Sequence, residues 1–329
     1  MSYPYKVEEL ISSLRSSPRL RQKEEIKNLW SLLPQISKIG DEEVILGDDA
    51  AAIADGEGYL LLAAEGIWTP LLLANPYMAG RAAVLVNVND IYAMGGRPLA
   101  IVNVLYSLDS EDMKEVFRGM VENSSRYRVP IVGGHLITEA KSPCLCVFIL
   151  GRASKLLSGF AAQAGDDLVF VGNFKGKFYS KFNFWDSSSS LSGNEVVTQL
   201  ELLPQLAEEG LADAARDVSM AGLIGSSLML LEASGKGADI FLQRIPVPLE
   251  VPLSDWLLTF PSFGFILSLR PHNTPKVRER FSKFGLVCET IGKVTYTKRV
   301  FLVGDGGNKN GDKNLVWDFN EEAFTGVGP

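Results

Sequence analysis

The sequence predicts an α/β protein with two domains, and three observations support this prediction. A chain of 329 residues is long enough for two domains of ordinary size. Over residues 44–150, strand-like apolar runs alternate with helical patterns, which is typical of layered α/β architectures. After residues 152–166 the same alternation starts again. We therefore expect an N-terminal domain over residues 1–155 and a C-terminal domain over residues 156–329.

The first domain is expected to contain, in order, helix 8–38, strands 44–46 and 59–64, helix 77–94, strand 99–106, helix 109–127, and strands 129–132 and 144–150. Helix 77–94 is nearly free of charge, which predicts that it is buried on most sides. Asp109 has the residue type of an N-cap and precedes an amphipathic pattern.

The second domain is expected to contain strand 167–171, helices 194–210 and 220–233, strand 238–242, helix 253–259, strand 263–269, helix 275–284, and strands 286–291 and 299–303. Residues 173–193 combine aromatic residues, lysines and a run of four serines, and we interpret them as a long loop. Residues 174–185 interleave lysines with aromatic residues, and a lid over a substrate is favoured over a base-stacking surface, because this basic stretch is short and the protein is acidic.

The composition excludes several classes of protein. The chain has 39 acidic and 32 basic residues and a net charge of −7, which argues against a general nucleic-acid binder. Its three cysteines and two histidines do not predict a structural zinc site, and a reducing cytosol is the simplest compartment for them. The charged N-terminus lacks the apolar run of a signal peptide, and no stretch approaches the length of a membrane span. We expect a cytoplasmic protein without membrane contact.

Two acidic segments have the chemistry of a cation site. Asn87 and Asp90 share one face of an apolar helix, where a carboxylate must be paired or bind a metal; a ligand and a structural salt bridge are equally good interpretations. Asp48 and Asp49 follow a strand and could bind Mg²⁺ with substrate phosphates, although a solvated turn is the better interpretation of this motif alone. Glu65 ends an apolar strand, where α/β proteins gather their ligands or where a polar residue simply ends the strand.

Two further segments are less specific. Gly133 and Gly134 would let backbone N–H groups approach an anion, whereas the neighbouring His135 has the character of a structural histidine. Asp217 and Ser219 precede helix 220–233, and one of them is interpreted first as its N-cap. The usual nucleotide motifs are missing: the Gly/Lys segment 172–178 is too short for a P-loop, and no strand is followed by Gly-x-Gly-x-x-Gly.

In their order and spacing these segments resemble the AIR synthase (PurM-like) superfamily. Its members include AIR synthase, formylglycinamidine ribonucleotide synthetase, thiamine-monophosphate kinase, selenophosphate synthetase and the HypE hydrogenase maturation protein. The resemblance covers about residues 44–300. Within the superfamily, the pattern is most similar to that of AIR-synthase-related proteins such as methanogenesis marker protein 2. It is carried by Gly-Asp-Asp-Ala-Ala (47–51), Glu65, Val-Asn-Asp-Ile-Tyr-Ala-Met-Gly-Gly-Arg-Pro (88–98), Gly-Gly-His (133–135), Ala-Gly-Asp-Asp (164–167) and Asp-Val-Ser (217–219).

The resemblance implies a PurM-like fold, a homodimer formed by the N-terminal α/β domains, and transfer of the γ-phosphoryl group of ATP to a small-molecule acceptor with Mg²⁺. The acceptor is not identified by the sequence. The residues implied as metal ligands are Asp48, Asp49, Glu65, Asp90 and Asp217. Those expected to bind the nucleotide are Gly47, Asn87, Asn89, Gly95, Gly96, Gly133 and Gly134. Those expected to be catalytic are Asp90, His135 and Asp217.

Several departures distinguish the chain from individual members. Thiamine-monophosphate kinases carry aspartates at the positions of His135 and Met220, and a Gly-Glu-Asp-Tyr-Glu segment where this chain has residues 260–265. The first cysteine is Cys144, so the N-terminal Cys or Sec of selenophosphate synthetase is missing, and the chain ends without the cysteine of the hydrogenase protein. The Asp-Gly-Val-Gly-Thr-Lys segment of AIR synthase is also missing. The alternative hypothesis is therefore a catalytically degenerate nucleotide-binding regulator or assembly partner.

Overall fold

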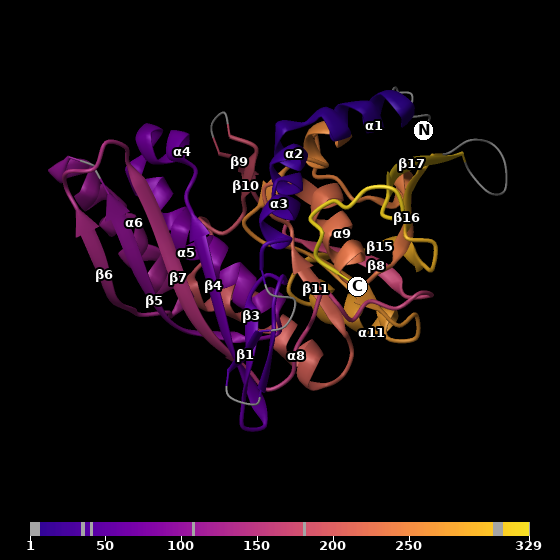
Figure 1. The fold of residues 1–329 in the computed structure, drawn as a ribbon, viewed down its shortest axis with the longest axis horizontal. Helices are drawn as coiled ribbons and strands as arrows, with labels where there is room; N and C mark the ends of the chain where they lie inside the picture. Colours follow the sequence, from indigo (N-terminus) through magenta and orange to yellow (C-terminus); the bar gives the residue numbers. More distant parts are fainter. Residues whose placement is uncertain are drawn as a thin grey trace. The chain divides into compact units, whose positions relative to one another are not determined.

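The computed structural model describes residues 7–33, 37–39, 42–106, 109–179, 182–304 and 312–328. It divides the chain into two compact units, each with mixed α/β structure, as predicted (Figure 1). Unit 1 contains Met1–Ile36, Leu157–Ser189 and Glu209–Pro329, and unit 2 contains Ser37–Leu156 and Ser190–Glu208. A domain boundary at residues 155/156 stays a prediction of the sequence. Within the described residues, no helix is both long enough and apolar enough to cross a membrane.

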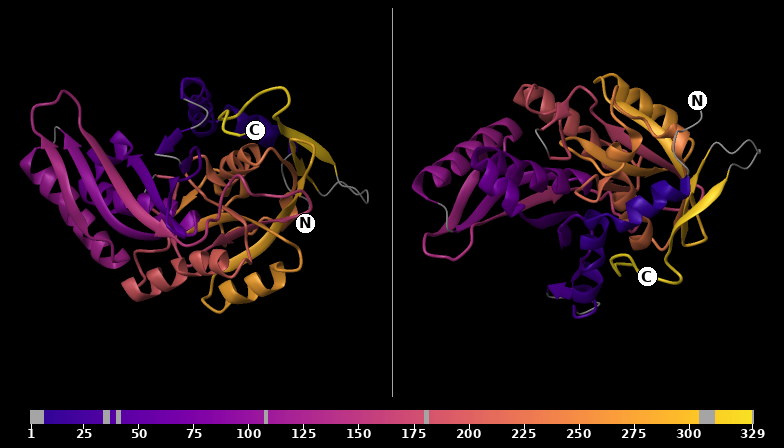
Figure 2. Two further views of the ribbon diagram at one scale, coloured as in Figure 1. Left: turned by 60° about the horizontal axis from the view of Figure 1, so that its bottom comes forward. Right: turned by 90° about the horizontal axis from the view of Figure 1, so that it is seen from above.

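Unit 2 is built on a seven-stranded sheet. Its strands, in spatial order, are β1 (Ser37–Ile39), β2 (Glu42–Ile45), β3 (Ala51–Asp55), β4 (Gly58–Gly66), β7 (Cys144–Ala153), β5 (Arg97–Tyr106) and β6 (Ile131–Ile137). All neighbours are antiparallel except β5 and β6, which are parallel. Helices α5 (Pro76–Ala93) and α6 (Ser110–Tyr127) lie on one side of the sheet, and the short α4 (Thr69–Ala74) precedes them (Figure 2).

Helix α5 confirms the predicted buried helix. Asn75 caps its first turn by accepting a hydrogen bond from the Met78 N–H, and Pro76 stands at the first helical position, where no N–H is needed. The backbones of α5 and α6 approach closely, because a Cβ added to Gly80 would lie 2.0 Å from the Val116 carbonyl oxygen. Two larger residues at this crossing would hold the helices apart.

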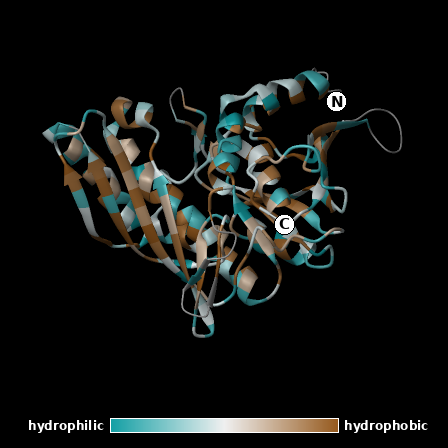
Figure 3. Ribbon diagram, viewed as in Figure 1, coloured by the Kyte–Doolittle hydropathy of each residue, from teal (hydrophilic) through white to brown (hydrophobic). Residues whose placement is uncertain are grey.

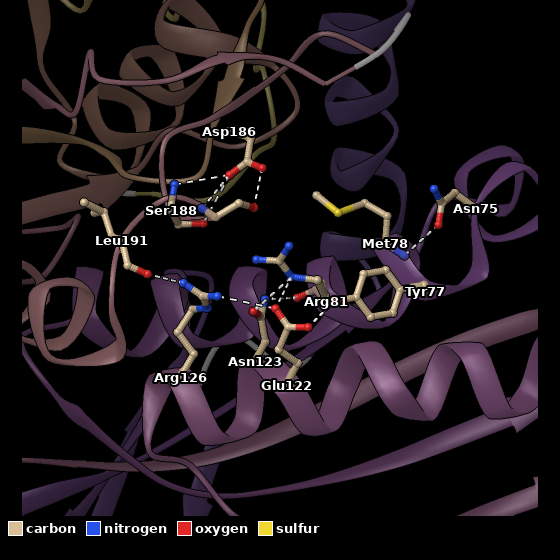
Figure 4. A network of polar contacts seen from close by, with 11 residues as sticks. Asn75, Tyr77, Met78, Arg81, Glu122, Asn123, Arg126, Asp186, Ser188 and Leu191 are labelled. Carbon is tan, nitrogen blue, oxygen red and sulfur yellow. Dashed lines mark hydrogen bonds and ion pairs between the residues drawn. The ribbon is translucent and has the colours of Figure 1, made fainter.

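A polar network joins α5 to α6 (Figure 4). Asn123 accepts a hydrogen bond from Nε of Arg81 at 3.2 Å and donates one to the Arg81 carbonyl oxygen at 2.7 Å. Glu122 accepts a hydrogen bond from the Tyr77 hydroxyl and pairs with Arg81 at 3.7 Å. Arg126 contacts Glu122 as well and donates to the carbonyl oxygen of Leu191, which holds the segment Ser190–Glu208 against α6 within unit 2. Asp109 caps α6, as predicted.

The segment predicted as helix 194–210 forms two helices, α7 (Gly193–Leu200) and α8 (Leu202–Glu208). Ser192 and Glu195 form a capping box at the start of α7. The break follows from Pro204, which lacks the N–H that would continue the helical ladder across Leu200. Arg97 donates to Glu201 at 2.9 Å and to Glu208 at 2.5 Å, which ties α8 to the start of β5.

Unit 1 contains a second seven-stranded sheet. Its spatial order is β11 (Ala214–Asp217), β14 (Gly264–Leu269), β8 (Asp167–Gly172), β15 (Val287–Thr295), β12 (Gly237–Phe241), β16 (Arg299–Val303) and β17 (Lys313–Asp318). Every residue of β8 and of helix α9 (Gly222–Ala233) is buried, and Leu168 and Phe170 of β8 share one apolar core with α9. The remaining elements are α10 (Leu253–Trp256), the 3₁₀ turn η1 (Leu242–Arg244) and α11 (Thr274–Ser282).

Three predictions for unit 1 differ from the structure. The helix predicted over residues 8–38 is divided into α1 (Val7–Ser16), α2 (Pro18–Glu24) and α3 (Ile26–Trp30), because Pro18 follows the capping residue Ser17 and starts a new helix; residues 34–36 lie outside the described residues. The predicted loop 173–193 contains β9 (Lys177–Phe178) and β10 (Phe184–Asp186), which form a three-stranded sheet with β13 (Phe260–Pro261). Strand β17 lies in the tail for which no strand was predicted, after residues 305–311, which are not described.

The aromatic residues of the β9–β10 segment serve the core of unit 1. Trp185 is buried and packs edge-on against Phe178 and Trp256. Its indole N–H donates to the Asn173 carbonyl oxygen at 3.0 Å. The packing explains why aromatic residues of this segment form strands rather than an irregular loop. A lid over a substrate stays a prediction, and Lys181, a basic residue of the predicted loop, lies outside the described residues.

Candidate functional site

The acidic turn Asp48–Asp49 lies between β2 and β3. Gly47 has a φ of +89°, a conformation that favours glycine, and both aspartates are half-buried. Strand β3 pairs with β4 so that Ala51 lies opposite Leu62. The chain just before β3 therefore lies beside the end of β4, where the half-buried Glu65 stands. The pairing brings these three carboxylates to the same end of the unit 2 sheet.

Helix α5 contributes buried polar residues to the same unit. Asn87 is fully buried; its Nδ2 donates to the Ala83 carbonyl oxygen at 2.9 Å, while its Oδ1 accepts no hydrogen bond from the described residues. Asn89 and Asp90 are buried as well, at 1% and 6% exposure. Ile91, one turn after Asn87, lies over Gly151 of β7. Since α5 runs back along the sheet between the end of β4 and the start of β5, Asn87 lies nearer than Ile91 to the end that carries Glu65.

Gly95 and Gly96, which follow α5, each have a structural role. Gly95 has a φ of +73° and ends the helix. A Cβ on Gly96 would lie 2.3 Å from a methyl group of Leu61, so glycine is required for the helix end to pack on β4. Nucleotide binding by Gly95 and Gly96 stays a prediction.

A row of paired residues crosses the sheet below α5. Glu65 of β4 pairs with Val147 of β7, Val147 pairs with Asn103 of β5, and Asn103 pairs with Gly134 of β6. Residues directly paired across strands project to the same face. Val147 is fully buried, so this row lies on the face that the helices cover. Glu65 and Gly134 therefore share a row and a face.

His135 lies on the opposite face of the same sheet. It pairs with Val104, which pairs with Cys146, and its side chain is exposed. Gly133, two residues away, alternates to the same side as His135. The Gly-Gly-His segment was predicted to follow a strand, but it lies inside β6, because the parallel pairing with β5 continues through it. The structure does not bring His135 to the face that carries Glu65.

Asp217 belongs to unit 1 and is considered there alone. It is the last residue of β11, is 5% exposed and pairs with Phe265 of β14. The predicted N-cap is not observed: α9 starts after Ala221 without a side-chain cap. Gly222, with a φ of +68°, packs against the Leu257 carbonyl oxygen and fixes the start of the helix. The local role first expected for Asp217 is therefore not the one found.

Asp166 and Asp167, whose motif echoes the first Gly-Asp-Asp, have structural partners. Asp166 accepts hydrogen bonds from the Gln163 N–H and, at 2.7 Å, from the Ser268 hydroxyl. Asp167 accepts a hydrogen bond from the Thr274 hydroxyl at 2.7 Å and pairs with Lys293 at 2.6 Å. These contacts hold the start of β8 in the unit 1 sheet.

Among the described residues, no three His, Cys, Asp or Glu side chains are gathered in a group that could hold a metal ion. The carboxylate and amide oxygens of unit 2 are of the kind that Mg²⁺ binds together with phosphate oxygens. One buried polar residue near them, Asn103, is missing from the predicted set. Its signal in the sequence is weak: a single amide in the apolar run Ile-Val-Asn-Val-Leu (101–105).

Comparison with known proteins agrees with the division into two α/β units. The family described as "AIR synthase related protein, N-terminal domain" matches residues 47–153, and the corresponding C-terminal domain matches residues 163–305. The chain belongs to the AIR synthase related family. This AIR synthase related protein is 43% identical over 320 residues to an uncharacterized protein of Synechocystis sp., with 97% of this chain and 98% of that protein covered. It is 27% identical to a selenide, water dikinase of Clostridium botulinum, with 77% and 75% covered.

Solved structures show the same fold. The PurL protein of T. maritima complexed with ATP superposes with a TM-score of 0.73 at 21% identity, covering 99% of this AIR synthase related protein and 53% of the PurL chain. The chain thus spans about half the length of that PurL. AaThiL complexed with AMPPCP and TMP gives a TM-score of 0.62 at 21% identity, with 89% and 95% covered. The PurM-like fold predicted from the sequence is confirmed.

Proposed function

We propose that the protein is a cytosolic enzyme that binds ATP with Mg²⁺ in unit 2 and transfers the γ-phosphoryl group to a small-molecule acceptor. The observation that carries the proposal is that the pairing of β3 with β4 brings Asp48, Asp49 and Glu65 to one end of the unit 2 sheet, while α5 of the same unit contains the buried residues Asn87 and Asp90. The relatives support it, since one is a dikinase and two related structures hold ATP or its analogue AMPPCP.

The donor set fits magnesium. All of its members offer oxygen, which Mg²⁺ prefers, and Mg²⁺ typically takes one or two carboxylates and completes its shell with water and phosphate. The buried Asn87 Oδ1 is an acceptor that no described residue satisfies, and a cation or its water would satisfy it. Bound there, the ion would neutralise the charge of the phosphates during transfer. Asp48, Asp49, Glu65 and Asp90 are the proposed ligands.

The remaining predicted residues divide between two faces of the sheet. We propose that Gly134, in the row of Glu65, lets its backbone approach a phosphate closely, and that Gly47, Asn89, Gly95 and Gly96 shape the surrounding backbone. His135 and Gly133 face the other side. Their roles in catalysis and in nucleotide binding stay predictions of the sequence.

For unit 1 we propose that Asp217 is this unit's own cation ligand. It is buried at the end of the edge strand β11, and the family resemblance implies a metal ligand at this position. Replacing Asp217 with Asn should lower the affinity for Mg²⁺ and leave the melting temperature nearly unchanged. A variant with unchanged Mg²⁺ affinity would assign Asp217 a structural role.

Calorimetry with AMPPCP and Mg²⁺ tests nucleotide binding. Wild type should bind the analogue only with Mg²⁺ present, and Asp90→Asn should lower the affinity at least about tenfold, as the loss of a metal-site partner typically does. Asp112→Asn, an equivalent change in the first turn of α6, is the control and should bind like wild type. Well-folded wild type that does not bind AMPPCP in either condition would refute the proposal.

A nucleotide-binding regulator without catalysis is the second candidate. The observation that favours it is Met220, which is 37% exposed directly after Asp217-Val218-Ser219, where an acidic residue is expected of a kinase in this family. Measuring ADP release from ATP with a panel of acceptors separates the two candidates. Turnover that Asp90→Asn abolishes supports the enzyme, whereas tight binding without turnover for any acceptor supports the regulator.

We also propose a homodimer formed through the open face of the unit 2 sheet. In Figure 3 the strands of this sheet are largely brown, and the face away from α5 and α6 carries exposed apolar residues at Leu62, Val102, Phe148 and Leu150. Apolar patches of this kind mark interaction surfaces, and a second copy presents an identical patch. Phe148→Asp should give monomers in sedimentation experiments, while Phe284→Asp, in unit 1 and similarly exposed at 41%, should not. Unchanged sedimentation of Phe148→Asp would place the interface elsewhere.

A further inference from the structure

Asn103 is a buried residue of β5 whose side-chain oxygen has no hydrogen-bond partner among the described residues. Its side chain is 2% exposed, and its Oδ1 accepts no hydrogen bond from any residue that the structure describes. Asn123 of α6 is equally buried but bonds with both ends of its amide to Arg81. Leaving a buried amide oxygen unpaired is unfavourable, and in native proteins such atoms usually have a partner. The burial of the Asn103 amide oxygen is therefore not explained by hydrogen bonds within the described residues, whereas that of the Asn123 amide is.

The register of the sheet places Asn103 between two parts of the proposed site. It pairs with Gly134 on one side, and through Val147 it lies two strands from Glu65. Adjacent strands are about 4.8 Å apart, so the Cα atoms of Asn103 and Glu65 are separated by about 10 Å. The valine between them is shorter than either polar side chain. An ion above Val147 is within reach of both a carboxylate and an amide oxygen.

Gly134, which has no Cβ, leaves space for the side-chain amide of Asn103. A Cβ at position 134 would lie 2.5 Å from Asn103 Oδ1, closer than real atoms approach, and no other residue type lacks this atom. The oxygen thus occupies space that only glycine keeps open. A polar atom that is buried, unpaired and accommodated in this way is better explained by a ligand than by packing.

We infer that Asn103 binds the cation of unit 2 through its amide oxygen, in the row that joins Glu65 to Gly134. The inference rests on the proposed Mg²⁺–ATP function and adds one ligand to it. Amide oxygens are hard donors of the kind that Mg²⁺ and Mn²⁺ accept. The Asn103 oxygen would lie between the carboxylate group and the glycine that admits phosphate, and so would fix the ion between them.

Mn²⁺ binding, followed by electron paramagnetic resonance without nucleotide, tests the inference directly. Asn103→Leu removes the oxygen at similar volume and should weaken Mn²⁺ binding about tenfold or more. Asn103→Asp keeps an oxygen at the same place and should bind Mn²⁺ at least as tightly as wild type. Asn123→Leu is the matched control: it should bind Mn²⁺ like wild type when folded.

Stability of the metal-free protein provides an independent measurement. Asn103→Leu should unfold at the same urea concentration as wild type or at a higher one, because it removes an unsatisfied buried oxygen. Asn123→Leu should unfold at a lower concentration, because it removes both hydrogen bonds between Asn123 and Arg81. A loss of stability in Asn103→Leu as large as in Asn123→Leu would assign Asn103 a structural role and overturn the inference.

The outcomes separate this inference from the function on which it rests. Wild type that binds neither Mn²⁺ nor AMPPCP with Mg²⁺ overturns the proposed function. Wild type that binds Mn²⁺ with the same affinity as Asn103→Leu overturns the inference alone. Asn103→Asp that binds as weakly as Asn103→Leu also overturns it, because the amide N–H groups rather than the oxygen would then contact the ligand.

Discussion

Gly134 lies directly against Asn103: a Cβ built on Gly134 would lie 2.5 Å from the Asn103 amide oxygen and 2.8 Å from its carbonyl oxygen. Gly133 has open space, since the nearest atom to its Cβ would be a Val102 methyl group at 3.8 Å. We expect Gly134→Ala to lower the free energy of unfolding by about 1–3 kcal/mol through overpacking. Gly133→Ala should be neutral or stabilise by up to about 1 kcal/mol. Urea unfolding of both variants measures this, and equal effects would contradict the prediction.

The Glu122 network between α5 and α6 should make the free energy of unfolding depend on pH in the acidic range. The Tyr77 hydroxyl, and then Arg81 and Arg126, hold the pKa of Glu122 below its usual range. A lowered pKa in the folded protein means that this contribution is present above the unfolded pKa of about 4.3 and is lost as pH falls through the lower folded value. Glu122→Gln should therefore remove part of the loss of stability that wild type shows on acidification.

Urea unfolding at several pH values between neutral and about 3 checks this prediction. The control is Glu111→Gln in the first turn of α6. The Glu111 side chain is 80% exposed and, among the described residues, forms an ion pair with Lys114 alone. We expect the pH dependence of Glu111→Gln to follow wild type. Curves for Glu122→Gln and wild type that run parallel over this range would show that the network does not favour the ionised carboxylate.

Much of the fold could be predicted because local signals agreed with burial. Helix α5 combines a proline start, an asparagine cap and an almost uncharged sequence, and it was predicted within one residue at each end. Helix α6 has an equally clear start at Asp109. In such elements the residues that set the ends are neighbours in sequence, so sequence patterns contain the information.

The parts that could not be predicted depend on contacts distant in sequence. The Gly-Gly-His segment is a strand only because β5 lies beside it, and the aromatic segment around Trp185 forms strands because it packs on Trp256. Asn103 became a candidate only through its register with Glu65 and Gly134. A single sequence contains no record of which strands pair, so a lone asparagine in an apolar run looks like an ordinary strand residue.

Arg97 should hold helix α8 in place within unit 2. It donates to Glu201 and Glu208, and its side chain is 40% exposed, so solvent screens both ion pairs. We expect Arg97→Ala to lower the free energy of unfolding by only about 1 kcal/mol while increasing amide hydrogen exchange in α8. Arg118→Ala, which removes a single exposed pair with Glu115, should leave exchange in α8 unchanged. Equal exchange in the two variants would mean that apolar packing alone holds the helix.

Glu232 should anchor the C-terminal segment to α9 in unit 1. It is only 8% exposed, and its carboxylate accepts hydrogen bonds from the backbone N–H groups of Phe324, Thr325 and Gly326 and from the Thr325 hydroxyl, at 2.6–3.2 Å. Hydrogen bonds to a buried charge are stronger than neutral ones, and the N–H groups would be left without this partner. We expect Glu232→Ala to lower the free energy of unfolding by about 3 kcal/mol or more.

Proteolysis and urea unfolding together test this anchor. In Glu232→Ala, a protease should cleave residues 321–328 before the rest of the chain unfolds, because three backbone N–H groups of this segment lose their hydrogen-bond acceptor. Glu322→Ala is the control: this residue is 48% exposed in its side chain and pairs with Arg15 and Lys27 at the surface, so its loss should be worth no more than about 1 kcal/mol. If both variants lost the same stability and resisted the protease equally, the C-terminal segment would be held by the packing of Phe324 against Trp317 and not by the buried carboxylate.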